Sequence, residues 1–151
     1  MKRLKSLSWK HRNIIIYLWL IVSLIGFTDA SYLSIKHYRG EVPPCLLTSG
    51  CETVTTSKYA TVFTIPVALV GAIYYLTVFL LSVLYLDTKS TLLLKIIPPL
   101  TGGGFIASLT FIYLQLFLIH AICIYCVVSA FTSTGLFVLS MIPHVIKSPT
   151  Q

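Results

Sequence analysis

The chain has 151 residues, of which 56% are hydrophobic and only 10% are charged, and its formal net charge is +7. A soluble domain usually carries about 25% charged residues, so this chain lacks the polar side chains that a water-facing surface needs. The length suits one domain, and the composition indicates a membrane protein. The basic residues are not interleaved with aromatic ones, so we expect no nucleic acid as a partner.

Four apolar segments are long enough to cross a bilayer as helices. A helix needs about 20 apolar residues to span the ~30 Å hydrocarbon core, and it satisfies its backbone hydrogen bonds internally. We therefore predict an all-α membrane protein, built as a four-transmembrane-helix bundle in residues 13–146. The predicted spans are residues 13–35, 65–86, 98–119 and 121–143.

Residues 1–12 form a basic tail before the first predicted span. Basic residues followed by an apolar run also resemble a secretory signal, but FTDAS is a poor cleavage site and the apolar pattern continues to Ile35. We expect the segment to be retained. Asp29 is the single charge in this span and lies near its outer end, where we expect the carboxylate to reach the interface.

The predicted outer loop, residues 36–64, carries Cys45 and Cys51 in the sequence CLLTSGC. Pro66 suits the first turn of a helix, so the second span is expected to begin near residue 65. The sequence PPLTGGG before the third span is poor helix material, and we expect a regular helix only after Gly104.

The fourth span opens with a Cys-x-x-Cys pair, Cys123 and Cys126. Residues three apart share one face of a helix. The free N–H groups and the dipole at a helix N-terminus favour a thiolate, which is the attacking species in thiol–disulfide exchange. His120 precedes this pair and is a candidate for passing a proton.

The distribution of Lys and Arg predicts the orientation in the membrane, because these residues mark the cytoplasmic side. Most of them lie in the N-terminal tail, in the loop between the second and third spans, and in the tail 147–151. We predict a multi-pass protein of the cell membrane with both termini in the cytoplasm. All four cysteines are then extracytoplasmic, in the compartment where disulfides persist.

Three interpretations of the cysteines stay open at this point. Two structural disulfides would staple the outer face of a non-enzymatic four-span protein, although a Cys-x-x-Cys bridge constrains the unfolded chain little. The second interpretation is a zinc site with four thiolate ligands. Because Cys-x5-Cys is an unusual spacing for zinc ligands, we predict no metal. The third is a redox relay, in which Cys45 and Cys51 exchange with an outside partner and with Cys123 and Cys126. Because Cys126 lies within an apolar helix, the terminal acceptor of such a relay would be a lipid-soluble quinone.

Taken together, the motifs resemble the vitamin K epoxide reductase family in its bacterial or archaeal form. The resemblance covers about Trp19–Pro143. It is carried by Cys45-x5-Cys51, by TTSKYATVFTIPVALVG at Thr55–Gly71, and by CIYCVVSA at Cys123–Ala130.

The resemblance implies a bundle around a quinone of the ubiquinone or menaquinone type, with the outer loop as a lid. It implies that Cys126 faces the quinone, that Cys123 is its exchange partner, and that Cys45 and Cys51 form a shuttle pair. Ser57 matches a serine that lies beside the shuttle cysteines and the quinone.

The sequence also departs from the family in ways that bear on its activity. Vertebrate members place an asparagine and a tyrosine against the ring, at positions that fall near Val67 and Ala130 here. This difference puts epoxide reduction in question, but not disulfide–quinone exchange. Many bacterial relatives carry a fused thioredoxin-like domain, whereas this chain ends at Gln151, so we expect a separate partner.

The resulting prediction is a quinone-linked thiol–disulfide oxidoreductase that supports disulfide bond formation. Electrons would pass from a secreted thioredoxin-like protein through the two cysteine pairs to a membrane quinone. An unrelated bacterial disulfide-forming quinone reductase also has four helices, but its Cys-x-x-Cys lies in the first outer loop, which is the reverse arrangement.

Overall fold

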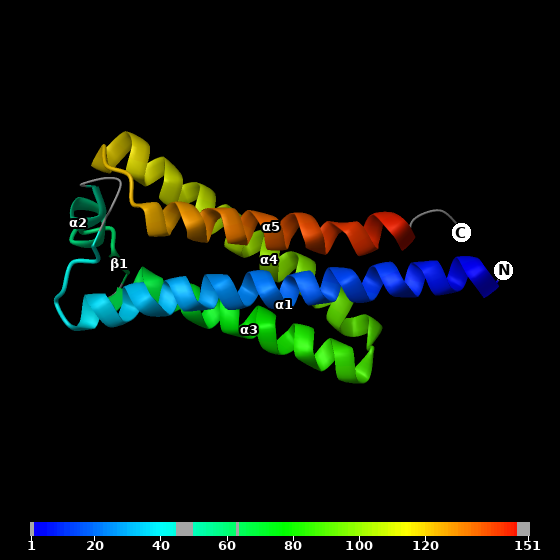
Figure 1. Ribbon diagram of the computed structural model, residues 1–151. Coiled ribbons are helices and arrows are strands. Elements are labelled where there is room, and N and C mark those ends of the chain that lie inside the picture. The colour runs from blue at the N-terminus through cyan, green and yellow to red at the C-terminus, as the bar shows by residue number, and fades with distance from the viewer. Residues whose placement is uncertain (1, 45–49, 63, 148–151) are drawn as a thin grey trace.

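The structure is a computed structural model that describes residues 2–44, 50–62 and 64–147. Long helices run along the length of the molecule and form a bundle (Figure 1). They are α1 (Lys2–Tyr38), α3 (Val67–Thr88), α4 (Thr91–Tyr113), which continues as the π-helix η1 (Leu114–Ile119), and α5 (Ile124–Lys147).

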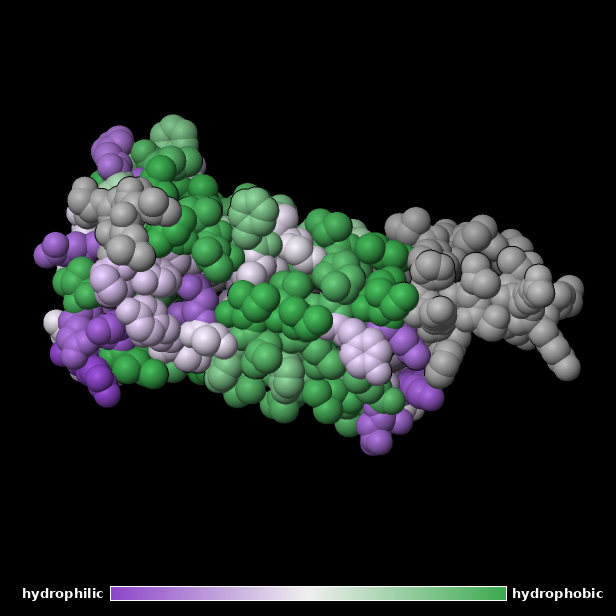
Figure 2. All heavy atoms as spheres, viewed as in Figure 1, coloured by the Kyte–Doolittle hydropathy of each residue, from purple (hydrophilic) through white to green (hydrophobic). Residues whose placement is uncertain are grey.

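In the described part of the chain, four helical segments are long and apolar enough to cross a membrane. They are Asn13–Tyr38, Val67–Thr88, Leu92–Ile119 and Ile124–Ile142. Many large apolar side chains on them point outward, and Figure 2 shows hydrophobic residues across the middle of the molecule with hydrophilic residues toward its ends. Lipid is the environment that such a surface fits, so the predicted all-α membrane fold is confirmed.

All four long helices extend beyond the predicted spans, α1 and α4 by the most residues. The helix α1 runs without a break through the basic tail. The helix α4 begins at Thr91, where the Ser90 side chain accepts a hydrogen bond from the Leu92 N–H, and it continues through Pro98 and Pro99. The expectation of a regular helix only after Gly104 is therefore wrong. A Cβ atom at Gly104 would collide with the Tyr74 ring. This glycine lies inside the helix α4 and permits close packing of α3 on α4.

The main hydrophobic core joins α1, α3, α4 and α5. Its large, almost fully buried side chains include Trp19, Tyr75, Ile97 and Leu136. Tyr75 lies against Gly26, where any Cβ atom would overlap its ring. This close approach holds α1 and α3 together along one side of the bundle.

The segment between α1 and α3 folds over one end of the bundle. It contains the short helix α2 (Gly50–Thr55) and a two-stranded antiparallel hairpin, β1 (Thr61–Val62) and β2 (Ile65–Pro66). Figure 1 shows α2, β1 and the turn before α5 at the same end, whereas the start of α1 and the end of α5 lie at the other. This arrangement brings the predicted outer loop next to the Cys-x-x-Cys motif.

Candidate functional site

Cys123 caps the N-terminus of α5. Its carbonyl accepts the first helical hydrogen bond, from the Val127 N–H at 3.1 Å. Its sulfur accepts hydrogen bonds from the Cys126 thiol and from the backbone N–H groups of Cys126 and Tyr125, and these bonds lower the Cys123 pKa to about 7 against the opposing effect of burial. Cys123 and Cys126 are both free thiols. The Cys126 thiol and the free N–H groups at the helix N-terminus therefore favour a Cys123 thiolate.

Gln115 fixes the turn that carries Cys123. Its side-chain Oε1 accepts a hydrogen bond from the Cys123 N–H at 2.9 Å. Its backbone carbonyl accepts from the Ala121 N–H at 3.1 Å and from the N–H of His120, which has a left-handed conformation with φ of 54°. Gln115 belongs to η1, and the wider winding of a π-helix is typical of functional sites. One residue thus anchors the turn through both its main chain and its side chain.

Cys51 lies against the same turn. Cys51, Val54 and Cys123 are the buried members of one hydrophobic cluster, and Cys126 packs at its edge. Cys51 is disulfide-bonded. A Cβ atom at Gly50 would lie 2.6 Å from the Ile122 carbonyl oxygen, so the absence of a side chain there lets α2 approach the turn. Cys45, the other predicted loop cysteine, lies outside the described residues.

The loop is also tied to α5 by aromatic residues. Tyr125, between the two cysteines of the motif, donates a hydrogen bond from its hydroxyl to the Pro44 carbonyl at 3.1 Å. Its ring packs against Tyr32 of α1, with ring centroids 5.5 Å apart. The residue between the two cysteines therefore contacts both the start of the covering loop and α1.

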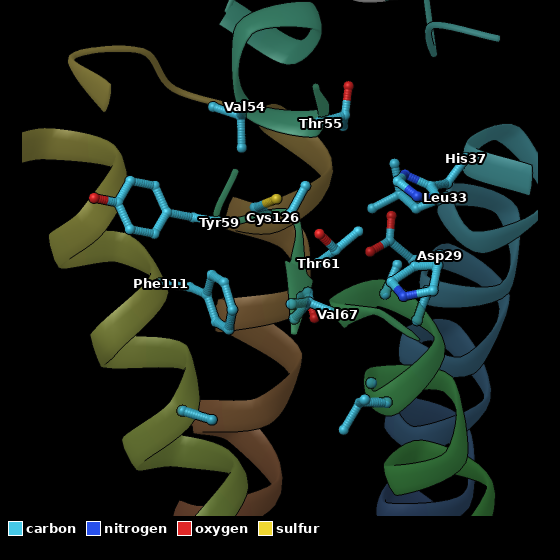
Figure 3. Close-up of a pocket in the computed structure, with 18 of the residues that line it drawn as sticks. Asp29, Leu33, His37, Val54, Thr55, Tyr59, Thr61, Val67, Phe111 and Cys126 are labelled. Atoms are coloured by element: carbon cyan, nitrogen blue, oxygen red, sulfur yellow. The ribbon is translucent and has the colours of Figure 1, made fainter. Parts of the chain in front are cut away.

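A cavity of about 790 Å³ lies beneath this loop, between the helices. Figure 3 shows Cys126 of α5, Asp29 of α1 and Phe111 of α4 around it, with Val54 and Thr55 of α2 above. Most of the residues that line the cavity have apolar or small side chains. The cavity is large enough for a drug-sized ligand, and the Cys126 thiol forms part of its wall.

Ser57 also lines this cavity, next to the segment that carries Cys51. Its hydroxyl donates to the Val54 carbonyl at 2.8 Å, which closes the turn after α2. Val67 and Ala130 line the cavity as well, so these two positions face the site with apolar side chains. His120 is exposed and is not among the lining residues.

Two buried polar atoms at the cavity have no hydrogen-bond partner in the described part of the chain. They are Asp29 Oδ2 and Gln115 Nε2. The expectation that Asp29 reaches the interface is therefore corrected: its carboxylate belongs to the cavity wall (Figure 3). Unpaired buried polar atoms are costly, and their presence around the cavity indicates a ligand that carries polar atoms.

Comparison with known protein families gives a match to the model of the vitamin K epoxide reductase family over residues 17–141. The chain belongs to this family. The predicted resemblance is thereby confirmed over most of the chain. No curated protein matches the sequence.

Members of the vitamin K epoxide reductase family are generally membrane oxidoreductases that couple disulfides to a quinone. Two features of this structure fit such a ligand. The cavity wall is largely apolar, which suits the ring and isoprenoid tail, and the unpaired Gln115 Nε2 is a donor of the kind that a carbonyl oxygen accepts. The structure therefore accommodates the ligand class that the family uses.

Sequence reasoning missed Gln115. The available signal was that Gln115 is the sole Asn or Gln between Asn13 and Gln151, and that it lies in an apolar segment. Gly50 was missed as well. Its role depends on the backbone of Ile122, which is distant in sequence, so no local pattern reveals it.

Proposed function

We propose that this family member is a quinone-dependent thiol–disulfide oxidoreductase that oxidises an extracytoplasmic thioredoxin-like protein and thereby supports disulfide bond formation. The observation that carries the proposal is the position of the two cysteine regions. Cys51 and Cys123 are buried in one cluster, and Cys126 lines the cavity. Electrons that reach Cys51 are thus one exchange from a dithiol that touches the cavity.

The burial of Cys51 and Cys123 in one cluster supports an order for the exchange. A reduced partner first opens the loop disulfide, in which we propose that Cys45 pairs with Cys51. The Cys51 thiolate then attacks Cys123 of the inner disulfide, the Cys123–Cys126 bond breaks, and Cys126 leaves as a thiolate. Cys45 next attacks Cys51 and releases Cys123. A thiol of low pKa is a good leaving group, so the hydrogen bonds to the Cys123 sulfur favour this step.

The final step oxidises Cys123 and Cys126 back to their disulfide. A bound quinone supplies an acceptor for the two electrons and two protons that the Cys123–Cys126 dithiol releases. We propose a quinone of the ubiquinone or menaquinone type, with Ser57 and Cys126 at its site.

The charge pattern supports an orientation with cytoplasmic termini and extracytoplasmic cysteines. Lys89 and Lys95 lie around the α3–α4 turn, and the basic residues of α1 lie at its start, away from α2. A membrane-impermeant maleimide should therefore label a single cysteine introduced at Glu41, but not one introduced at Lys89, in intact cells. Equal labelling of both would refute the orientation.

The function is tested with purified protein in lipid nanodiscs, using reduced thioredoxin as electron donor and ubiquinone-1 as acceptor. We expect quinone loss, followed by its absorbance, that vanishes in Cys126→Ser and in Cys51→Ser. With dithiothreitol as donor, Cys51→Ser should regain activity, because a small dithiol can reduce the inner pair directly, whereas Cys126→Ser should not. No quinone loss with ubiquinone-1 or menaquinone-4 would favour a protein whose cysteines are only structural.

A further inference from the structure

Gln115 is a buried carboxamide at the junction of the cysteine turn and the cavity. Its side chain is 2% exposed, and it lines the cavity that Cys126 also lines. The backbone N–H of Cys123 can only donate, so the atom of Gln115 that it meets at 2.9 Å must be the carbonyl oxygen. The orientation of the amide is thereby fixed, and Nε2 is the other atom.

The Nε2 group of Gln115 has no hydrogen-bond partner among the described residues. A buried N–H group without a partner costs about 1–3 kcal/mol, and native proteins rarely tolerate this unless a ligand or water completes the bond. Because the group is a pure donor, its ligand must present an acceptor. A quinone carbonyl is such an acceptor, and the developing negative charge on its oxygen during reduction strengthens the bond.

We propose that Gln115 couples the two halves of the reaction: Oε1 positions the Cys123–Cys126 turn, and Nε2 donates a hydrogen bond to a carbonyl oxygen of the quinone in the cavity. This inference rests on the proposed function. It identifies Gln115 as the residue that sets the ring against Cys126, a role that the apolar Val67 and Ala130 side chains on the same wall do not fill. Gln115 lies in the π-helix η1, shortly before the turn that leads to Cys123, and its amide presents one atom to that turn and the other to the cavity.

The first test measures binding rather than turnover. The fully oxidised protein has no electrons to transfer, so stabilisation by ubiquinone-1 in a thermal melt reports equilibrium binding. Gln115→Met removes both amide contacts, and Gln115→Glu, measured at a pH at which its carboxyl group is ionised, keeps the acceptor but has no donor. We expect both variants to bind ubiquinone-1 about three- to tenfold more weakly, which is the usual effect of one lost hydrogen bond.

The matched control is Thr101→Val. Thr101 is also a fully buried polar residue of the α4 segment, but it bonds to Ser140 at 2.9 Å and does not line the cavity. This variant should keep wild-type quinone binding even if it loses stability. If Gln115→Glu fails to fold, Gln115→Met alone decides the question.

The second test separates positioning from binding. In single turnovers of the reduced protein, Gln115→Met should raise the quinone concentration that gives half of the maximal rate. It should also move the titration of the Cys123 thiol upward from about pH 7, because the Cys123 N–H that holds the turn loses its acceptor. Wild-type quinone binding in Gln115→Met would overturn the inference and leave the function standing. Absence of quinone binding in the wild-type protein itself would instead refute the proposed function.

Discussion

The two ends of the bundle are built from the same four helices but are packed differently. Toward the end away from α2, large buried side chains such as Trp19, Ile97 and Leu136 form a hydrophobic core. Toward the α2 end, α3 and α4 contribute small residues, including Gly71, Gly103 and Ala107, and these line a cavity. Side-chain size thus determines where the bundle is a solid core and where it holds a ligand.

The largest effect is expected from Leu136→Ala at the packed end. Leu136 is fully buried, and removing such a side chain costs about 2–5 kcal/mol. Val138→Ala, on the same helix but 56% exposed, is the control and should change the free energy of unfolding little. Reversible unfolding in mixed micelles measures both. Similar losses in the two variants would contradict the difference in packing between a buried core and a lipid-facing surface.

Gly103→Leu should have the next largest effect, and this effect is on quinone binding rather than on the free energy of unfolding. A Cβ atom at Gly103 meets nothing within 4 Å, and the residue lines the cavity, so a leucine there would occupy the ligand's space. We expect ubiquinone-1 to bind at least about tenfold more weakly, the equivalent of roughly 1.4 kcal/mol. Gly135→Leu is the matched control, because its Cβ position is equally open but lies outside the cavity lining. Unchanged quinone binding in Gly103→Leu would show that the ligand lies elsewhere.

Gly50→Ala tests the contact between the loop and the cysteine turn. The added methyl group would overlap the Ile122 backbone, so α2 must move away from Cys123. We expect thioredoxin-driven quinone reduction to slow by about tenfold, while dithiothreitol-driven reduction stays near the wild-type rate. Equal slowing with both donors would mean that the substitution damages the inner site instead.

The smallest effect concerns the protonation of Cys123. Its thiol has a pKa lowered to about 7, so the thiolate fraction should rise as the pH increases through 7, well below the range of an ordinary cysteine. Thiolate absorbance at 240 nm, taken as the difference between the wild type and Cys123→Ala, measures this titration. A midpoint near 9 would show that the helix N-terminus and the Cys126 thiol do not stabilise the anion.

The sequence by itself determined the membrane class, the four helices and the family. The length and low charge of an apolar segment are enough to predict a membrane-spanning helix. The two cysteine pairs are short motifs whose spacing can be read directly from the sequence, and they indicate the family. The N-terminal position of Cys123 on α5 was also readable, because the turn before the helix interrupts the apolar pattern.

Only the tertiary structure decided which residues meet at the site. Asp29 of α1 lines the cavity, and Gln115 of η1 meets Cys123 across the turn between η1 and α5. The glycines at 50 and 104 matter through atoms of distant residues, Ile122 and Tyr74. Contacts between segments that are distant in sequence depend on helix packing and loop closure. Local sequence patterns do not predict these contacts.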